Sequence, residues 1–194
     1  MVKVLVSSCL IGAPVRYNGK DKKVSHPVLE RWMLEGRVVA ACPEVLGGLG
    51  TPRPPAEVIH VQRIRRVVAG TGRDVTSEFE QGAALALEQA LRNGASIAVL
   101  KEGSPSCGSR WIYDGTFSGA RVSGEGVTAS LLRSRGIRVF SEEEFEAADA
   151  AIREIERQRQ LPTTQLATTQ LPTTQLSTTQ LPTTQLPTTQ DDGS

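Results

Sequence analysis

Residues 2–9 read VKVLVSSC, and this stretch decides the fold class. Valine and leucine occupy positions on both faces of a strand, a pattern typical of a β-strand buried on both sides. Such strands occur mainly in parallel sheets whose two faces are covered by helices. The run therefore predicts an α/β domain. It is better explained as a first strand than as a signal peptide, and no stretch of the chain is long enough to span a membrane.

Similar apolar runs recur along the chain and alternate with helical patterns. Three further buried strands are expected at RVVAA (37–41), SIAVLK (96–101) and IRVF (137–140). VIHVQ (58–62) and IRRVVAG (64–70) predict a hairpin or two short edge strands. Two stretches, 43–57 and 102–124, are rich in glycine, proline and serine and are interpreted as irregular loops.

Helix signals lie between these strands. Ser25 is expected to cap a helix over about 26–35, and the capping boxes Ser77/Glu80 and Ser141/Glu144 are expected to begin two more. A fourth helix is expected over 126–136, closed by Gly136. The sequence thus predicts a single Rossmann-like α/β domain, with a mostly parallel sheet of about four strands, flanking helices and a short β-hairpin.

The C-terminal part of the chain has a different character. Residues 161–190 are six copies of a five-residue unit of the type LPTTQ, without charge or aromatic residues. One leucine per unit buries too little surface to offset the entropy of ordering, so residues 159–194 are predicted to be a disordered repeat tail. Residues 1–158 are predicted to be the globular domain.

Charge and cysteine content argue against a nucleic-acid-binding protein and against a protein built on disulfides. The chain has 22 basic residues, against 19 acidic ones once Asp191 and Asp192 of the tail are set aside. This balance is too mild to indicate nucleic-acid binding. Three cysteines, an odd number in a chain without a visible leader, argue against a disulfide framework and for a reducing cytoplasm.

The three cysteines all follow predicted strands. Cys9 comes after the first strand, Cys42 after the second and Cys107 after the third. Because the carboxyl ends of parallel strands lie at one edge of the sheet, we expect the three thiols to meet in one crevice. The short loops around them, SSCLIG, ACPEVLGG and SPSCG, contain small or kinked residues that leave backbone N–H groups free to face sulfur.

Several uses of three thiols are compatible with these residues. They could be small buried apolar residues without a chemical role. A nucleophilic cysteine needs a base, and the only histidines, His26 and His60, do not follow main strands. A zinc site would require a fourth ligand. An iron–sulfur cluster normally takes four thiolates, so three would leave one iron open to a substrate atom.

Four separated motifs then resemble one family. VSSCLIGAPVRYNG, CPEVLGGLGTPRPPAE, LKEGSPSCG and IYDGTFSGARVSGEGVTASLL are similar, in this order, to the domain of unknown function 523 family, which includes bacterial thiouracil desulfurases. The resemblance covers about residues 2–145. It implies that Cys9, Cys42 and Cys107 ligate a 4Fe–4S cluster with one free iron, that Glu44 is an active-site acid/base, and that Ser104 is a second catalytic residue.

The resemblance also implies a reaction and a substrate class. A thiolated pyrimidine such as 2-thiouracil, or a related thioamide, would bind the open iron through its sulfur, and water would replace that sulfur without redox chemistry. Arg16, Tyr17, Arg53, Trp111, Tyr113 and Asp114 lie in the same predicted loops, where stacking and hydrogen bonds could hold a planar ring. Loop packing explains each of them equally well. Arg53, between two prolines, is the strongest candidate.

Two alternatives to the desulfurase remain at this point. The chain could be a sulfurtransferase that carries persulfide on a cysteine without a cluster. It could also be a non-catalytic protein that binds a metal or a cluster. Iron and sulfide analysis of the protein purified without oxygen would test the sulfurtransferase hypothesis, and sulfide release from a thiolated pyrimidine would test the non-catalytic one.

Overall fold

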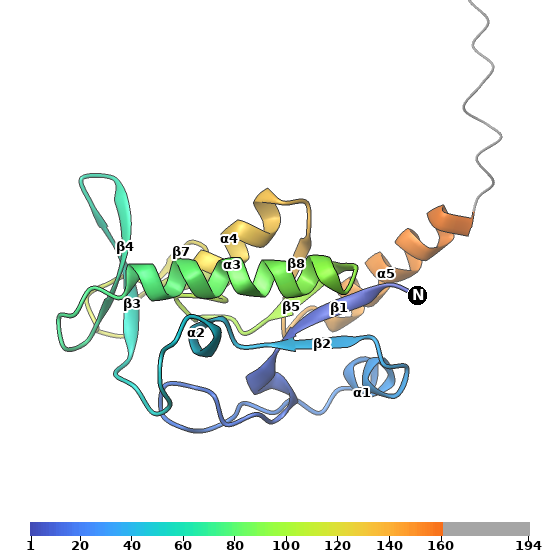
Figure 1. Ribbon diagram of the computed structural model, residues 1–194, viewed down its shortest axis with the longest axis horizontal. Helices are drawn as coiled ribbons and strands as arrows, with labels where there is room; N and C mark the ends of the chain where they lie inside the picture. The colour runs from blue at the N-terminus through green and yellow to red at the C-terminus, as the bar shows by residue number, and fades with distance from the viewer. Residues whose placement is uncertain (161–194) are drawn as a thin grey trace, which may run out of the picture. The chain divides into compact units, whose positions relative to one another are not determined.

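A four-stranded parallel sheet forms the centre of the computed structural model, which describes residues 1–160 (Figure 1). Its strands are β1 (Lys3–Ser7), β2 (Val38–Ala41), β5 (Ala95–Leu100) and β8 (Arg138–Ser141), in the spatial order β2-β1-β5-β8. All three neighbouring pairs are parallel, so the predicted α/β fold with a parallel sheet of four strands is confirmed. The predicted repeat tail lies outside the described residues, apart from Arg159 and Gln160.

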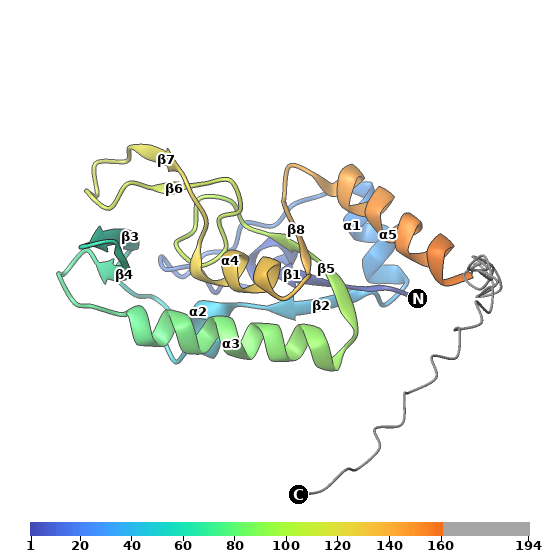
Figure 2. The same ribbon diagram turned by 90° about the horizontal axis from the view of Figure 1, so that it is seen from above.

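Helices cover both faces of this sheet (Figure 2). Helices α1 (Pro27–Leu34) and α5 (Phe145–Gln160) pack on one face, and α3 (Thr76–Arg92) and α4 (Val127–Ser134) pack on the other. Between the sheet and the helices lie two clusters of buried apolar side chains: the first faces α1 and α5, and the second faces α3 and α4. Strand β1 contributes to both, because Val4 and Val6 belong to the first cluster and Leu5 belongs to the second. This division explains why the first strand is apolar at successive positions.

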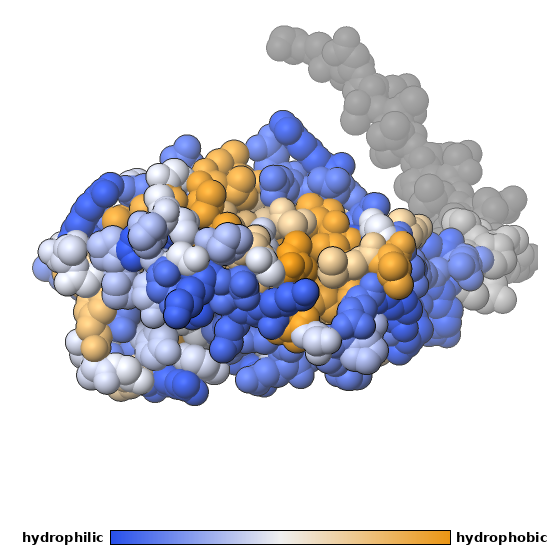
Figure 3. All heavy atoms as spheres, turned by 90° about the horizontal axis from the view of Figure 1, so that it is seen from below, coloured by the Kyte–Doolittle hydropathy of each residue, from blue (hydrophilic) through white to orange (hydrophobic). Residues whose placement is uncertain are grey.

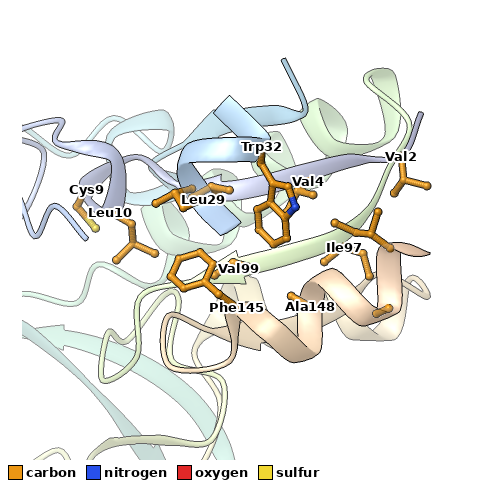
Figure 4. Close-up of a cluster of buried hydrophobic side chains, with 13 residues drawn as sticks. Val2, Val4, Cys9, Leu10, Leu29, Trp32, Ile97, Val99, Phe145 and Ala148 are labelled. Atoms are coloured by element: carbon orange, nitrogen blue, oxygen red, sulfur yellow. The ribbon is translucent and has the colours of Figure 1, made fainter. Parts of the chain in front are cut away.

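The first of these clusters runs along the sheet from Val2 to Cys9 (Figure 4). Trp32 and Phe145 are its largest members, and both are fully buried. Burial of each such aromatic side chain contributes on the order of 1.5–3 kcal/mol to folding. Figure 4 shows Cys9 at one end of the cluster, beside Leu10, so the apolar layer continues to the edge where the first cysteine lies.

Two antiparallel hairpins lie outside the central sheet. The predicted one consists of β3 (Ala56–Val61) and β4 (Ile64–Ala69). The second, β6 (Trp111–Tyr113) with β7 (Arg121–Ser123), lies in the stretch 102–124 that the sequence indicated as irregular. That expectation was wrong because strands of three residues carry too little periodic pattern to be recognised.

Two short helices also occur where loops were expected. The 3-10 helix η1 (Ser8–Ile11) follows β1 directly, and the single-turn helix α2 (Pro43–Leu46) follows β2. Both begin at or next to a cysteine. Helices of one turn are set by tertiary packing rather than by a sequence period, which is why residue patterns did not reveal them.

The helix starts differ in part from the expected caps. His26 Nδ1, rather than Ser25, accepts the hydrogen bond from the Val28 N–H that caps α1, at 3.3 Å. The Ser77/Glu80 box does not form; instead the Asp74 carboxylate accepts from the Thr76 N–H at 2.9 Å. The Ser141 box does form, since the Glu144 carboxylate accepts from the Ser141 N–H at 2.9 Å. Local polar side chains compete for the same first-turn N–H groups.

The surface carries polar and apolar residues in mixture. Figure 3 shows hydrophobic residues gathered toward the middle of the face seen from below, with hydrophilic residues around them. Within residues 1–160, no helix has both the length and the apolar character that crossing a membrane requires.

Candidate active site

The three cysteines lie at the same edge of the sheet, beyond the carboxyl ends of three adjacent strands. Cys9 lies in η1 after β1, Cys42 caps α2 after β2, and Cys107 lies in the turn region after β5. From β1 the chain moves first to β2 on one side and later to β5 on the other side. This edge is therefore a topological switch point, where α/β sheets usually bind their ligands.

All three cysteines carry free thiols that are sheltered from solvent. Cys9 is 8% exposed, Cys107 is 5% exposed and Cys42 is half-buried. Burial, followed by the nearby Cys42, raises the pKa of Cys9 to about 11, while Arg16 and Lys101 act in the opposite direction. Burial also raises the pKa of Cys107, to which Cys9, Cys42 and Glu44 add. The thiols thus share one electrostatic environment and stay protonated at neutral pH without a metal.

This protonation state bears on how the thiols can act. A protonated thiol is a weak nucleophile, because the thiolate is the reactive form. A bound metal centre would deprotonate such thiols by ligation. Neither histidine is placed to serve as a base: His26 hydrogen-bonds to Glu146 and stacks on Phe145, while His60 lies in β3. The surroundings of the thiols therefore suit ligation better than nucleophilic catalysis.

The donor set also limits which metal centre could fit. Among residues 1–160, no three His, Cys, Asp or Glu side chains lie close enough together to hold a single metal ion. Three thiolates that each bind a different iron of a cluster do not have to converge on one ion. Three sulfur donors, with no nitrogen donor among them, have the chemistry of an iron–sulfur site with one iron lacking a protein ligand.

Glu44 lies in the first turn of α2, two residues after Cys42, and its two carboxylate oxygens have different partners. Oε2 accepts hydrogen bonds from Arg53, at 2.9 Å from Nε and 2.8 Å from Nη2. Oε1 accepts one from the Ser104 hydroxyl at 3.3 Å. Arg53 is itself fixed, since its guanidinium also donates to the carbonyls of Val15 and Gly50. The carboxylate is thus held on one oxygen and only loosely engaged on the other.

Ser104 connects this carboxylate to the cysteine turn. Its Oγ accepts hydrogen bonds from the backbone N–H groups of Ser106 and Cys107, both at 3.1 Å, while it donates to Glu44. Ser104 is therefore part of the framework of the turn as well as a neighbour of the proposed acid/base. These three bonds use the single hydrogen and both lone pairs of the hydroxyl, so Ser104 can affect the chemistry through the Glu44 carboxylate.

Glycine contacts hold α2 in place. A Cβ on Gly82 of α3 would lie 1.9 Å from the Pro43 carbonyl oxygen, and a Cβ on Gly47 would lie 1.9 Å from that of Glu78. The backbones of α2 and α3 thus touch directly, which no other residue allows without a shift. Sequence reasoning missed this contact. Its only signal was a glycine inside an otherwise good helix, where alanine would normally be preferred.

Glu102 was also missed, although it organises the loop that carries Cys107. Its carboxylate is 3% exposed and accepts hydrogen bonds from the Ser109 hydroxyl and from the N–H groups of Ser109, Arg110 and Trp111. Burial alone would raise the pKa of Glu102, but these hydrogen bonds outweigh it and leave the pKa below its usual value. The signal in the sequence was an acidic residue placed directly after a buried strand.

The remaining predicted substrate residues are divided between two regions. Arg16 lies near Cys9, its guanidinium is 5.7 Å from the ring centre of Tyr17, and the Tyr17 carbonyl accepts from the Arg53 N–H at 2.8 Å. Tyr113 and Asp114 lie instead at the second hairpin, where the Asp114 carboxylate caps a turn through Thr116. The structure groups Arg16, Tyr17 and Arg53 with the cysteine loops, but not Tyr113 and Asp114.

Two cavities flank these elements. Glu44 and Arg53 line one of about 180 Å³, together with Gly50 and Phe79. The larger, of about 440 Å³, lies between the two hairpins and is lined by residues that include His60, Tyr113 and Asp114. The lining of neither cavity includes a cysteine. We therefore locate the candidate active site from the positions of the cysteines at the strand ends and from the hydrogen bonds of Glu44, and not from the size of a cavity.

Comparison with known proteins points to one family. The profile of the 2-thiouracil desulfurase family matches residues 4–144. The uncharacterized protein YbbK of Bacillus subtilis (strain 168) is 46% identical over 148 residues, which is 73% of this chain and 97% of YbbK. A solved structure described as the 4Fe–4S-dependent thiouracil desulfidase TudS is 49% identical, with a TM-score of 0.76, and the match covers 79% of this chain and 99% of TudS.

Proposed function

Because this chain belongs to the 2-thiouracil desulfurase family, a family of enzymes, we propose that it removes sulfur from a thiolated pyrimidine or a related thioamide with a 4Fe–4S cluster held by Cys9, Cys42 and Cys107. The observation that carries the proposal is the meeting of three free thiols and the Glu44–Ser104 pair at one edge of the sheet. The description of TudS as a 4Fe–4S-dependent thiouracil desulfidase supports the same assignment.

Cys9, Cys42 and Cys107 would hold the cluster as thiolates, and a cluster with three protein ligands would supply one open iron, a soft Lewis acid suited to a thiocarbonyl sulfur. Carboxylates are poor partners for such soft sites, so Glu44 is assigned to proton transfer rather than to ligation. Its salt bridge to Arg53 keeps one carboxylate oxygen fixed and leaves Oε1 available to the reacting groups.

The reaction exchanges sulfur for oxygen without a change of oxidation state. A water oxygen forms a bond to the ring carbon, the C–S bond breaks, and the two protons of water leave with sulfur as hydrogen sulfide. Glu44 accepts a proton from the attacking water and returns it to the leaving sulfur. Ser104, which donates to Glu44 Oε1, orients that carboxylate toward the water.

The substrate class follows from the residues around this edge. Arg16 and Tyr17 lie in the loop after β1, and Arg53 reaches the same loop through its hydrogen bond to the Val15 carbonyl. A cation and an aromatic ring suit a planar base with exocyclic acceptors. We assign Arg16 and Tyr17 to substrate binding. Arg53, expected from the sequence to share that role, has its N–H groups engaged by Glu44 and the neighbouring loops and acts here by holding Glu44. For Tyr113 and Asp114 the role rests only on their position in the predicted loops.

The persulfide alternative is less compatible with the site. A persulfide carrier needs an accessible thiolate, whereas burial raises the pKa of all three cysteines, including the half-buried Cys42. The non-catalytic alternative does not explain why a carboxylate is held by Arg53 beside the cysteines.

The test is anaerobic reconstitution with iron and sulfide, followed by incubation with 2-thiouracil. The proposal predicts about four irons per chain and release of uracil and sulfide in equal amounts. Chains with serine at Cys9, Cys42 or Cys107 should hold far less iron and release no sulfide. Sulfide release by the iron-free chain would contradict the cluster assignment, and a fully loaded chain that leaves 2-thiouracil intact would contradict the substrate class.

A further inference from the structure

Ser7 has a hydrogen-bonding arrangement that the proposed reaction does not explain. It is the last residue of β1, it is 3% exposed, and its hydroxyl donates a hydrogen bond to the Cys107 sulfur at 3.5 Å. The two residues are one hundred positions apart in the sequence. We propose that Ser7 is a positioning residue for Cys107 and that its hydrogen bond governs how firmly the cluster is held and at what potential it is reduced. This inference rests on the proposed function.

The direction of the Ser7 hydroxyl is set by its second partner. The backbone N–H of Lys101, directly after β5, donates to Ser7 Oγ at 3.0 Å. A serine hydroxyl has a single hydrogen, so accepting from Lys101 leaves that hydrogen free for the sulfur. The serine thus joins the ends of β1 and β5 and aims its proton at Cys107.

The other two cysteines lack such a side-chain donor among residues 1–160. The Cys42 thiol itself donates to the Val15 carbonyl oxygen at 3.9 Å, and no side chain of this region donates to its sulfur or to that of Cys9. Cys107 is therefore distinguished by a side-chain donor that a single substitution removes, together with the acceptor of the Lys101 N–H. This difference makes the role of the hydrogen bond measurable.

The expected effect follows from charge. A hydrogen bond to a ligating sulfur stabilises the more negative, reduced state of a cluster and so raises its reduction potential. In a buried site this effect is strengthened by the low local polarity. The same bond orients the ligand, and loss of groups that orient metal ligands typically costs about 10–100-fold in affinity.

The experiment compares four reconstituted full-length chains: wild type, Ser7→Ala, Ser7→Thr and Ser8→Ala. Ser8 is the adjacent serine without a side-chain hydrogen bond to Cys107, and threonine keeps the hydroxyl at position 7. The two readouts are the rate of iron loss to a chelator and the midpoint potential of the cluster. Ser7→Ala should lose iron about 10–100-fold faster and be reduced at a lower potential. Ser7→Thr and Ser8→Ala should match wild type.

Equal iron loss and equal potential in Ser7→Ala and wild type would overturn the inference while leaving the proposed function intact. If wild type itself loads no cluster, the proposed function fails instead. If Ser7→Ala loads no cluster, thermal unfolding of the iron-free chains distinguishes a role at the cluster from a purely structural role of Ser7. An unfolding temperature equal to that of Ser8→Ala supports a role at the cluster, and a marked loss of folding shows that Ser7 is only structural.

Discussion

Arg53 and Glu44 form a two-point ion pair across nine residues of chain, with Nε and Nη2 of Arg53 at 2.9 and 2.8 Å from the same carboxylate oxygen. The planar guanidinium makes this geometry possible, and its remaining N–H groups donate to the carbonyls of Val15 and Gly50 and to the Thr51 hydroxyl. The ion pair with Arg53 therefore fixes the position of the Glu44 carboxylate, the proposed acid/base.

Arg53→Lys should impair turnover and leave the cluster unaffected. Lysine keeps the charge but cannot hold Glu44 at two points or bind the two carbonyls at once. A displacement of about 1 Å in a catalytic group can cost on the order of 10²-fold in rate. Sulfide release from 2-thiouracil should fall by about that factor, with wild-type iron content. Unchanged release would show that the ion pair does not position Glu44.

Gly82→Ala should destabilise the chain although alanine is the better helix former. Helix propensity alone predicts a gain of about 1 kcal/mol. The new Cβ would lie 1.9 Å from the Pro43 carbonyl oxygen, and overpacking of this kind costs about 1–3 kcal/mol. Urea unfolding gives the sign, with Gln81→Ala on the exposed side of α3 as the matched control. Higher stability of Gly82→Ala would refute the contact between α2 and α3.

Glu102→Gln should change how stability depends on pH. The pKa of Glu102 is lower in the folded chain than in the unfolded chain, where it is about 4.3. The ionised carboxylate therefore adds to the free energy of unfolding above that pH, and this contribution is lost as the pH falls through the folded-state pKa. Glutamine is neutral, so all four donors lose their charged acceptor, at a cost of about 1–3 kcal/mol near pH 7. Urea unfolding from pH 3 to 7 should show the gap between wild type and variant narrowing in acid. A gap independent of pH would contradict this role.

Truncation after Gln160 should leave desulfuration unchanged. The family profile ends at residue 144, and every residue assigned to the site lies before position 115. The pentapeptide repeats carry no charge and no sulfur, so they offer no group for this chemistry. Sulfide release and iron content should equal those of the full chain. A large loss in either would show that residues 161–194 contribute to the site.

The parts of the structure that residue patterns predicted share a physical cause. The two inner strands, β1 and β5, are buried on both faces, so they are continuous apolar runs such as the one around Leu5, whereas the edge strands β2 and β8 are partly exposed. Cysteines at strand ends could be placed together because parallel strands end at one edge. Helix α2 and strand β6 could not be predicted, since elements this short depend on tertiary contacts such as Gly82 against Pro43.

The same limit applies to the polar network of the site. The Arg53–Glu44 pair crosses an irregular loop, and the bond from Ser7 to Cys107 joins residues one hundred positions apart. No local pattern encodes either contact. Glu102 was overlooked for a related reason: a single acidic residue after a strand indicates solvent exposure unless the donors that surround it are known.

Comparison of Glu44→Gln with wild type, both reconstituted to the same iron content, tests the central claim most directly. Glutamine keeps the shape of the side chain and can still bond to Arg53 through its carbonyl oxygen, but it cannot carry a proton. General acid–base groups contribute about 10²–10⁴-fold in rate. The measurement is the initial rate of sulfide release from 2-thiouracil. We expect an unchanged cluster spectrum and a loss of rate within that range, whereas a rate near that of wild type would contradict proton transfer by Glu44.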